Sequence, residues 1–316
     1  KSWAKEIMTQ ANVPTAKSQT FTDAEAAQAY IQQVGAPIVV KADGLAAGKG
    51  VTVATTKEEA IAAVAELLDD NSGKLVIEEF LTGSEVSVLA VTDGLTIRSL
   101  SPAQDHKRIG EGDTGKNTGG MGAYSPVPLV TQELSWRIEQ EILQPTLEAL
   151  KQQGIDYRGV LYAGLMITPA GEPKVIEFNC RFGDPETQVV LPLLDTPLDE
   201  ILLACVEQRL EQLPPLQWKS GSAVCVVAAS GGYPDVYQKG KAIAGIPEAE
   251  QQGAIVFQAG TKLEQAEIVT DGGRVLGITA VGDTFAEAVA ITYAALELIE
   301  FDAMYYRRDI GHKYRL

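Results

Sequence analysis

The sequence is poor in the residues that build disulfide frameworks and zinc sites. Its 316 residues include two histidines and three cysteines, Cys180, Cys205 and Cys225. The cysteines are odd in number and widely spaced, and no two of them form a C-x-x-C pair, so the pattern predicts neither a disulfide framework nor a structural zinc site. Such cysteine usage is typical of a reducing compartment, and we expect a cytoplasmic protein.

The sequence also lacks long hydrophobic runs and an excess of positive charge. Its longer apolar runs, such as residues 223–229, are far shorter than the ~20 residues that a membrane-spanning helix needs. Lys and Arg total 26 against 42 Asp and Glu, which gives a formal net charge of -16. Such a protein repels polyanions unless basic residues cluster locally. We therefore expect neither a membrane partner nor a nucleic-acid partner.

Helix signals and apolar residues are present throughout the chain. Hydrophobic residues make up 45% of the sequence, enough for a sizeable core, and the length predicts about two domains. In several places a hydroxyl residue precedes a glutamate by three positions, a pattern that predicts the start of a helix. The pairs are Thr22 with Glu25, Thr56 with Glu59, and Thr284 with Glu287.

The strand pattern divides the chain into successive units. Buried strands predicted within 36–43 and 75–80 combine with the first two helices into a small α/β unit. Residues 168–172 predict the turn of a hairpin. The proline-containing stretch 213–221 breaks the pattern, and we place a domain boundary there. The predicted domains are a lead-in helix at 1–12, the small unit at 13–82, a larger unit at 83–215 and a C-terminal domain at 216–316.

Lys41 and Lys49 flank a glycine-rich turn. Bare main-chain N–H groups and ammonium charges are what a polyphosphate requires. The turn is not a Walker A loop, because three residues instead of four separate Gly44 from Gly48, and Gly50 instead of Ser or Thr follows the lysine. The pattern predicts either a phosphate-binding turn or an ordinary glycine-rich hairpin turn.

The residues at and after the end of the predicted strand 75–80 could bind a nucleotide. The main chain of Glu78, Glu79, Phe80 and Leu81 could read an adenine edge, and Glu85 could hold ribose hydroxyls. The alternative interpretation is that Glu78, Glu79 and Glu85 are solvated charges at the end of a strand.

The segment 175–186 is the most informative part of the sequence. On a strand, Glu177 and Asn179 share one face and offer two oxygen ligands to a hard cation such as Mg²⁺, and Arg181 could lie near the phosphates bound to that cation. We expect this polar triplet to be buried among hydrophobic neighbours: Val175, Ile176, Phe178 and Phe182. The alternative is a structural ion pair between Glu177 and Arg181. Cys180 could be a nucleophile, but a small buried residue is the favoured interpretation.

A long polar stretch follows residue 104 and is rich in glycine. It comprises residues 105–108, 110–115 and 117–122, and it includes Lys107 and Arg108. Such loops are where substrate contacts concentrate. The stretch does not match the dinucleotide fingerprint, and the alternative to a phosphate-contacting loop is a mobile surface loop.

Taken together, these segments resemble the ATP-grasp superfamily and, within it, the family of phosphoribosylamine glycine ligases. The resemblance covers nearly the entire chain. In the first part it rests on residues 41–51, 105–108, 117–126, 164–166 and 175–186, and in the last part on residues 231–234 and 259–262.

The resemblance implies a fold and a reaction. The fold is α/β (α+β), with two α/β subdomains that clamp ATP and a small C-terminal domain of mixed α/β structure. The reaction joins glycine to 5-phosphoribosylamine with ATP and yields glycinamide ribonucleotide, ADP and phosphate through a glycyl phosphate, in purine biosynthesis. The implied cofactor is Mg²⁺ or Mn²⁺, and the implied partners are these small molecules.

The resemblance also implies roles for single residues. The phosphate contacts are Lys41, Gly48, Lys49 and Gly50. The adenine contacts are Glu78, Glu79, Phe80 and Leu81, and the ribose contact is Glu85. The metal ligands are Glu177 and Asn179, and the catalytic or substrate-facing residues are Arg181, Lys107, Arg108 and Asp184.

Two features depart from the family pattern. The hairpin partner of the metal strand is apolar around Leu165, where many ATP-grasp enzymes carry a metal-binding carboxylate, so we expect one ion that the protein itself holds well. The family also has an additional N-terminal α/β domain of on the order of one hundred residues. We expect this chain to begin just after that domain and to pack against it.

Two rival functions share parts of the pattern. Another ATP-grasp ligase, or a carboxylase that phosphorylates bicarbonate, would keep the ATP residues and differ at the substrate loop. A nucleotide-binding scaffold would tolerate the loss of metal ligands, and the intact set of Lys41, Glu177, Asn179 and Arg181 argues against it. The sequence therefore predicts a ligase and leaves the carboxylase open as the alternative.

Overall fold

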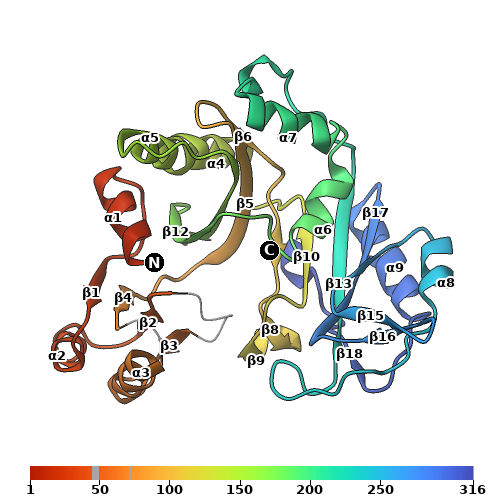
Figure 1. The fold of residues 1–316 in the computed structure, drawn as a ribbon, viewed down its shortest axis with the longest axis horizontal. Helices are drawn as coiled ribbons and strands as arrows, with labels where there is room; N and C mark the ends of the chain where they lie inside the picture. Colours follow the sequence, from red (N-terminus) through yellow and green to blue (C-terminus); the bar gives the residue numbers. More distant parts are fainter. Residues whose placement is uncertain (45–49, 71–72, 316) are drawn as a thin grey trace. The chain divides into compact units, whose positions relative to one another are not determined.

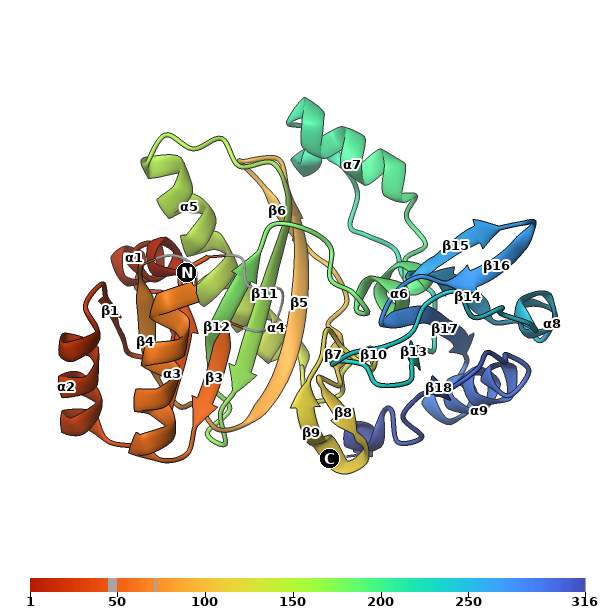
Figure 2. The same ribbon diagram turned by 60° about the horizontal axis from the view of Figure 1, so that its bottom comes forward.

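The computed structural model describes residues 1–44, 50–70 and 73–315. The chain packs into two compact units (Figures 1 and 2). The first unit holds residues 1–85, 132–157 and 163–178, and the second holds residues 86–131, 158–162 and 179–316. Each unit is therefore assembled from separate stretches of sequence. The domain limits predicted from the sequence, including the boundary within 213–221, stay predictions.

An antiparallel sheet with strand order β1-β4-β2-β3 forms the centre of the first unit. Its strands are β1 (Ser18–Phe21), β2 (Ile38–Ala42), β3 (Val51–Ala54) and β4 (Leu75–Glu79). Helices α2 (Ala24–Val34) and α3 (Lys57–Asp70) lie against this sheet (Figure 2). The fully buried side chains of Ile31 and Val64 from the helices share one core with Val40 and Ile77 from the sheet. The strands predicted within 36–43 and 75–80 are thus confirmed.

Side-chain caps set the starts of these helices. α3 follows its predicted capping box, because Glu59 N donates to Thr56 Oγ1 and Thr56 N donates to Glu59 Oε2, both at 3.2 Å. At α2, however, Asp23 accepts from Ala26 N at 2.8 Å and is the N-cap. A carboxylate caps a helix as well as a hydroxyl does, so the prediction that Thr22 caps this helix is wrong.

The first unit also contains helices outside this sheet. They are α1 (Ser2–Gln10), α4 (Gln132–Ile138), a π-helical turn (Glu139–Leu143) and α5 (Gln144–Gln152). α1 packs against α5 through a small apolar cluster that contains Ile7 and Leu150.

Another sheet has the strand order β12-β11-β5-β6. Its strands are β5 (Ser84–Thr92), β6 (Ile97–Ser99), β11 (Gly159–Ile167) and β12 (Pro173–Asn179). β11 and β12 are joined by a tight turn in which Thr168 N donates to the carbonyl oxygen of Glu172 at 3.0 Å, so the predicted hairpin is confirmed. Because β12 ends the strand order, it is an edge strand.

The second unit is built on a sheet with the strand order β14-β17-β13-β10-β7, to which β18 adds by pairing with β13. These strands are β7 (Gln104–Asp105), β10 (Gly122–Ser125), β13 (Ser222–Ser230), β14 (Ile255–Gln258), β17 (Arg274–Gly282) and β18 (Met304–Tyr305). β13 is buried along its whole length, which accounts for its continuous run of small and apolar residues. Helix α9 (Phe285–Leu296) begins at the predicted cap, where Thr284 Oγ1 accepts from Glu287 N at 3.2 Å.

Shorter elements complete the second unit. The helices are α6 (Thr187–Val190), α7 (Leu198–Glu207) and α8 (Ile246–Gln251). The two-stranded ribbons are β8 (Arg108–Gly110) with β9 (Thr114–Asn117), and β15 (Thr261–Glu264) with β16 (Glu267–Thr270). Short 3-10 helices span Glu111–Asp113, Leu191–Leu193, Leu210–Gln212 and His312–Arg315.

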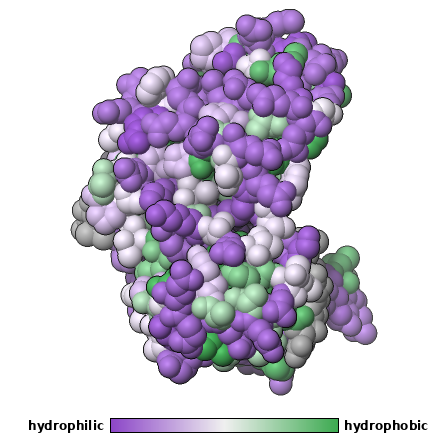
Figure 3. All heavy atoms as spheres, turned by 90° about the vertical axis from the view of Figure 1, so that its left-hand side faces the viewer, coloured by the Kyte–Doolittle hydropathy of each residue, from purple (hydrophilic) through white to green (hydrophobic). Residues whose placement is uncertain are grey.

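The surface is predominantly hydrophilic on the face that Figure 3 shows, and hydrophobic residues occur there in small groups. This agrees with a chain in which 22% of the residues are charged. Among the described helices, none is both long enough and apolar enough to cross a membrane.

Candidate functional site

A buried lysine lies near the end of strand β2 in the first unit. Lys41 Nζ donates to Glu78 Oε2 at 2.9 Å and to the carbonyl oxygen of Ile176 at 3.2 Å. A second lysine, Lys5, lies 3.3 Å from the same Glu78 oxygen, and all three charged side chains are at most 8% exposed. Charges removed from water need partners of this kind. Glu78 is therefore a buried carboxyl group paired with two lysines, and its interpretation as a solvated charge at a strand end is wrong.

The other residues of the predicted adenine and ribose contacts lie around the end of strand β4. β4 ends at Glu79 and β5 begins at Ser84, so Phe80 and Leu81 lie in the connecting segment. Phe80 is 40% exposed, and Glu79, Leu81 and Glu85 are partly buried. An exposed ring beside main chain outside the sheet suits contact with a purine base. The adenine and ribose roles stay predictions.

Strand β12 places the two predicted metal ligands on one face, because Glu177 and Asn179 are two residues apart within it. Glu177 is exposed and Asn179 is partly buried. Arg181 is exposed as well, and its Nη1 donates to the carbonyl oxygen of Phe182 at 2.9 Å. The expectation of a buried polar triplet is therefore wrong for Glu177 and Arg181. The expectation that Cys180 is buried is also wrong, since this cysteine is exposed.

The ligands on β12 fit a hard divalent cation. A carboxylate and an amide oxygen are ligands that Mg²⁺ accepts, and Mg²⁺ usually completes its shell with water and substrate phosphates. Across residues 1–44, 50–70 and 73–315, no group of three or more His, Cys, Asp and Glu side chains could hold a metal ion. An ion at Glu177 and Asn179 would therefore depend on phosphate oxygens for further ligands.

Part of the predicted phosphate turn lies outside the described residues, namely Gly48 and Lys49. Gly50 is buried, and its carbonyl oxygen accepts from Ala42 N at 2.9 Å. This bond extends the pairing of β2 with β3, in which Lys41 lies opposite Val51. The phosphate contacts of the turn stay predictions.

The hairpin of β8 and β9 carries predicted substrate residues in the second unit. Arg108 Nη1 donates to the carbonyl oxygen of Gly115 at 2.7 Å, which ties the two strands together. The carbonyl oxygen of Lys107 accepts from Thr118 N at 2.7 Å and from Thr118 Oγ1 at 2.8 Å. These bonds give the polar stretch a defined structure, and both Lys107 and Arg108 are partly buried.

The C-terminal segment holds the same hairpin through a buried arginine. Arg307 is 0% exposed and donates to Asp113 Oδ1 at 2.9 Å, to Asp309 Oδ2 at 2.7 Å and to the carbonyl oxygen of Arg108 at 3.0 Å. Burial raises the pKa of Asp113, but hydrogen bonds from Lys313 and Arg307 outweigh it and bring that pKa to about 2. The sequence prediction missed Arg307, because its partners in the hairpin, Arg108 and Asp113, are far away along the chain.

Asp184, predicted to face the substrates, is paired with an arginine that the sequence prediction also missed. Arg274 Nη2 lies 3.0 Å from Asp184 Oδ2, and Arg274 Nη1 lies 3.3 Å from Asp184 Oδ1, a bidentate contact. Gln188 Nε2 donates to Asp184 Oδ1 at 2.9 Å. No local sequence signal points to Arg274, because Asp184 lies 90 positions away along the chain.

The last residue of the segment 175–186, Glu186, belongs to a buried hydrogen-bonded cluster with Tyr162 and Ser87. Tyr162 Oη lies 2.7 Å from Ser87 Oγ and donates to Glu186 Oε1 at 2.8 Å. Burial and the charge of Glu186 raise the pKa of Tyr162, so the phenol keeps its proton. A Cβ atom at Gly183 would lie 2.4 Å from Glu186 Oε2. Any other residue at position 183 would therefore require the buried Glu186 carboxylate and the Tyr162 ring to shift.

His106 is 0% exposed, and its Nε2 accepts from Gly311 N at 3.2 Å. Burial, together with the charges of Arg307 and Lys313, lowers the pKa of His106 to about 3. An accepting Nε2 requires a neutral ring. His106 is thus a neutral side chain that anchors the end of the chain.

We expect His106→Gln to weaken the acid sensitivity of folding. Because the pKa of His106 falls from 6.5 to about 3 on folding, the unfolded chain binds the additional proton first as the pH falls. As the pH falls from about 6.5 to about 3, the free energy of unfolding therefore decreases by up to about 1.4 kcal/mol per pH unit. Urea unfolding at a series of pH values checks this, with His312→Gln, the chain's other histidine, as the control. An equal slope for His106→Gln and the wild type would contradict the assignment.

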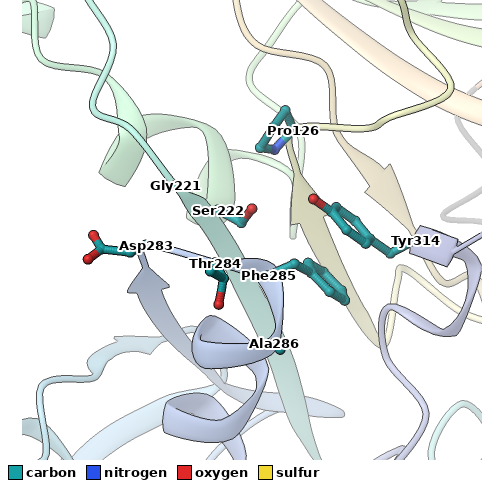
Figure 4. Close-up of a pocket in the computed structure, with 8 residues that line it drawn as sticks. All are labelled: Pro126, Gly221, Ser222, Asp283, Thr284, Phe285, Ala286 and Tyr314. Carbon is teal, nitrogen blue, oxygen red and sulfur yellow. The ribbon is translucent and has the colours of Figure 1, made fainter.

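A cavity of about 550 Å³ lies elsewhere in the second unit (Figure 4). Its lining residues are Pro126, Gly221, Ser222, Asp283, Thr284, Phe285, Ala286 and Tyr314. The rings of Phe285 and Tyr314 stack with their centroids 3.6 Å apart. None of the described residues predicted for the site lines this cavity.

Known proteins share both the sequence and the fold. Residues 1–187 match the ATP-grasp (A) domain of phosphoribosylglycinamide synthetase, and residues 223–313 match its C domain. A phosphoribosylamine–glycine ligase of Nostoc sp. is 63% identical over 318 residues, which covers 99% of this chain and 75% of the relative. The crystal structure of a phosphoribosylamine–glycine ligase of Thermotoga maritima has a TM-score of 0.90 and 37% identity, and the match covers 98% of this chain and 78% of that chain.

A more distant likeness concerns the fold alone. The biotin carboxylase domain of a 2-oxoglutarate carboxylase of Hydrogenobacter thermophilus has a TM-score of 0.71 at 17% identity, and the match covers 96% of this chain and 66% of that chain.

The fold and these matches define an ATP-grasp ligase, a class that uses ATP with a divalent metal ion. The matched residues and the identity to the Nostoc relative go further: the chain belongs to the phosphoribosylglycinamide synthetase family. The predicted family and the predicted α/β (α+β) ATP-grasp fold are confirmed. The roles of single site residues stay predictions.

Proposed function

We propose that this protein joins glycine to 5-phosphoribosylamine with ATP and forms glycinamide ribonucleotide, ADP and phosphate. The observation that carries the proposal is the 63% identity, over 99% of this chain, to a protein named phosphoribosylamine–glycine ligase. That name states both substrates. The reaction belongs to purine biosynthesis, and we propose that it takes place in the cytoplasm.

ATP is needed because a carboxylate oxygen is a poor leaving group. A carboxylate oxygen of glycine attacks the γ-phosphorus of ATP, the bond from that phosphorus to the β-phosphate oxygen breaks, and glycyl phosphate and ADP form. The amine nitrogen of 5-phosphoribosylamine then attacks the carbonyl carbon. Phosphate leaves with the electrons of the carbon–oxygen bond, and the amine releases a proton. Both steps depend on positioning and on neutralising phosphate charge.

The charges in the first unit suit the first step. Lys41 is buried beside Glu78 and contacts the carbonyl oxygen of Ile176, the residue before the predicted metal ligand Glu177. An ammonium group in this place can neutralise ATP phosphates next to strand β12. We assign this role to Lys41, and we assign the adenine and ribose contacts to the segment from Glu78 to Glu85.

Glu177 and Asn179 would hold the divalent cation, which we propose is Mg²⁺ or Mn²⁺. When bound, such an ion supplies positive charge to the phosphate oxygens. The protein's own contribution is to hold a carboxylate and an amide side by side on β12. We assign contacts with the transferred phosphate to Arg181, and contacts with glycine and the acceptor to Lys107, Arg108 and Asp184.

We propose that the complete enzyme also has an N-terminal domain. This chain spans 75% of the length of its Nostoc relative, which leaves room for one more domain of usual size. Attack on the glycyl phosphate requires the acceptor amine at the right distance, and misplacement by about 1 Å can cost roughly a hundredfold in rate. We assign the completion of the acceptor site to that domain.

ADP release in the presence of different substrates tests the proposal. With Mg²⁺, ATP and 5-phosphoribosylamine, we expect the protein that includes its N-terminal domain to release ADP rapidly with glycine and only at background rate with bicarbonate. The control omits 5-phosphoribosylamine and measures ATP hydrolysis alone. Release that responds to bicarbonate and not to glycine would reject the ligase and support the carboxylase.

A further inference from the structure

One guanidinium joins two segments of the second unit that carry predicted substrate residues. In addition to its bidentate contact with Asp184, Arg274 Nη1 donates to the carbonyl oxygen of Gly119 at 2.8 Å and to that of Asp184 at 3.0 Å. The Arg274 side chain is 21% exposed. A planar guanidinium fixes several acceptors in one geometry, which a single point charge cannot do. Arg274 therefore sets the position of the glycine-rich segment against the turn at Asp184.

Glycines make this close approach possible. A Cβ atom on Gly119 would lie 2.8 Å from Arg274 Cζ. Gly120 has a φ of +113°, and a Cβ atom there would lie 2.5 Å from Pro185 Cδ. No other residue type fits either position without moving its neighbours. The segment is shaped to receive Arg274 on one side and Pro185 on the other.

The neighbours of strand β17 fix the direction of the Arg274 side chain. Arg274 begins β17, and the pairing with β13 shifts register between Ala228 and Ala229, an irregularity of the kind that re-aims side chains. A Cβ atom on Gly273 would lie 2.3 Å from the Tyr233 ring, so the chain before Arg274 packs directly on that ring. Tyr233 Oη in turn accepts from Gly119 N at 2.9 Å. The direction of Arg274 and the place of Gly119 are thus set together.

The segment that Arg274 contacts, residues 118–121, is hydrogen-bonded to the main chain at the predicted substrate residue Lys107. Thr118, next to Gly119, bonds to the carbonyl oxygen of Lys107 through both its N–H and its hydroxyl group. Met121 N donates to the carbonyl oxygen of His106 at 2.8 Å. A shift of the segment that Arg274 holds would therefore move the main chain at Lys107 as well as the carboxylate of Asp184.

We propose that Arg274 is a positioning residue for the ligase reaction, a role that rests on the proposed function. It acts through Asp184 and through the main chain of Gly119 and Gly120, which orient the groups that face glycine and the acceptor amine. Arg274 itself does not contact the reacting atoms.

The test compares Arg274→Met and Arg274→Lys in the full-length enzyme. We expect Arg274→Met to lower kcat roughly 10- to 100-fold and to raise the KM for glycine or for 5-phosphoribosylamine. The KM for ATP should stay within about twofold, because the adenine and ribose contacts and the Lys41 contact are assigned to the first unit. Arg274→Lys should recover part of the loss, since it keeps the charge but not the planar fork.

A second ion pair in the same region provides a matched control. Lys116 Nζ lies 2.7 Å from Asp235 Oδ1, and both side chains are more than 60% exposed. This pair also joins the polar stretch to the neighbourhood of Tyr233, but it contacts none of the predicted substrate residues. Lys116→Met should therefore leave kcat and all KM values within about twofold of the wild type. Thermal unfolding of each variant shows which of them fold.

Two results would overturn the proposal: an unchanged kcat in Arg274→Met, or a KM for ATP that rises as much as the KM for glycine. If the wild-type enzyme shows no glycine-dependent ADP release, the proposed function fails. Amide hydrogen exchange at residues 118–121 then tests separately whether Arg274 holds this segment in place. Faster exchange in Arg274→Met than in Lys116→Met would support the positioning role, and equal exchange would reject it.

Discussion

Glu177→Gln should remove most of the metal-dependent turnover and leave the fold unchanged. The substitution keeps the size of the side chain but removes the one negative charge that the proposed metal site takes from strand β12. Preorganised charge at a phosphoryl-transfer site is worth roughly 100-fold or more in rate. Because Glu177 is exposed, the free energy of unfolding should change by less than about 0.5 kcal/mol.

The measurement is the rate of glycine-dependent ADP release over a range of Mg²⁺ concentrations, beside thermal unfolding. High Mg²⁺ should restore part of the activity of Glu177→Gln, because the defect lies in binding the ion. Glu172→Gln, an exposed glutamate in the turn that precedes β12, is the control and should behave as the wild type. Full turnover of Glu177→Gln at low Mg²⁺ would remove this residue from the metal site.

Lys41→Met should destabilise the fold and abolish tight ATP binding at the same time. Removing one partner of a buried ion pair typically costs about 3 to 5 kcal/mol, and we expect about 3, because Lys5 remains near Glu78. ATP affinity should fall by at least roughly tenfold, which corresponds to about 1.4 kcal/mol for one lost charge-assisted contact. Urea unfolding and calorimetric titration with Mg-ATP measure the two effects.

Two further variants separate the structural effect from the nucleotide effect. In Lys41→Met/Glu78→Leu no buried carboxylate is left with one partner missing, and Lys5 keeps its hydrogen bonds to Thr15 Oγ1 and to the carbonyl oxygen of Ala16. Stability should therefore return in part, although Lys5 loses its ion pair, while ATP affinity stays low. Lys5→Met removes the other ammonium group, 3.3 Å from the same carboxylate, and should lower stability while ATP binding persists. Recovery of ATP binding in the double variant would show that Lys41 is structural and does not contact phosphate.

Helix caps and the hairpin could be predicted from the sequence, because interactions between residues close together in the chain determine them. The capping boxes at Thr56 and Thr284 form as predicted, and the hairpin at 168–172 follows from its turn residues. The error at Thr22 has the same origin, since Asp23 is an equally good cap one residue further on and determines the start of the helix. Local patterns predict which kind of element forms better than its first residue.

Burial on strand β12 was harder to predict, because it depends on the neighbours of the strand in the sheet. The alternation of polar and apolar residues identifies the shared face of Glu177 and Asn179. It does not show that β12 is an edge strand, on which Glu177 is exposed. Nor does it show that Cys180 and Arg181, which follow the end of the strand, are exposed. The family resemblance indicated chemistry at these positions, but not their exposure.

Arg274 and Arg307 were missed for a related reason. Each binds segments that are distant in sequence: Arg274 contacts Gly119 and Asp184, and Arg307 contacts Asp113. Neither residue lies in a motif with a local chemical signature, and only the tertiary structure brings their partners together. Such long-range polar contacts are the part of this site that the sequence alone does not predict.

The central claim is that glycine becomes an acyl phosphate before it meets the acceptor amine, and oxygen transfer tests it most directly. The enzyme, with its N-terminal domain, is incubated with Mg-ATP, 5-phosphoribosylamine and glycine labelled with ¹⁸O in both carboxylate oxygens, and the released phosphate is analysed by mass spectrometry. Because one carboxylate oxygen attacks the γ-phosphorus and leaves with it, each phosphate should carry one ¹⁸O atom and the amide of the product should keep the other. Phosphate without ¹⁸O, formed together with glycinamide ribonucleotide, would contradict the account.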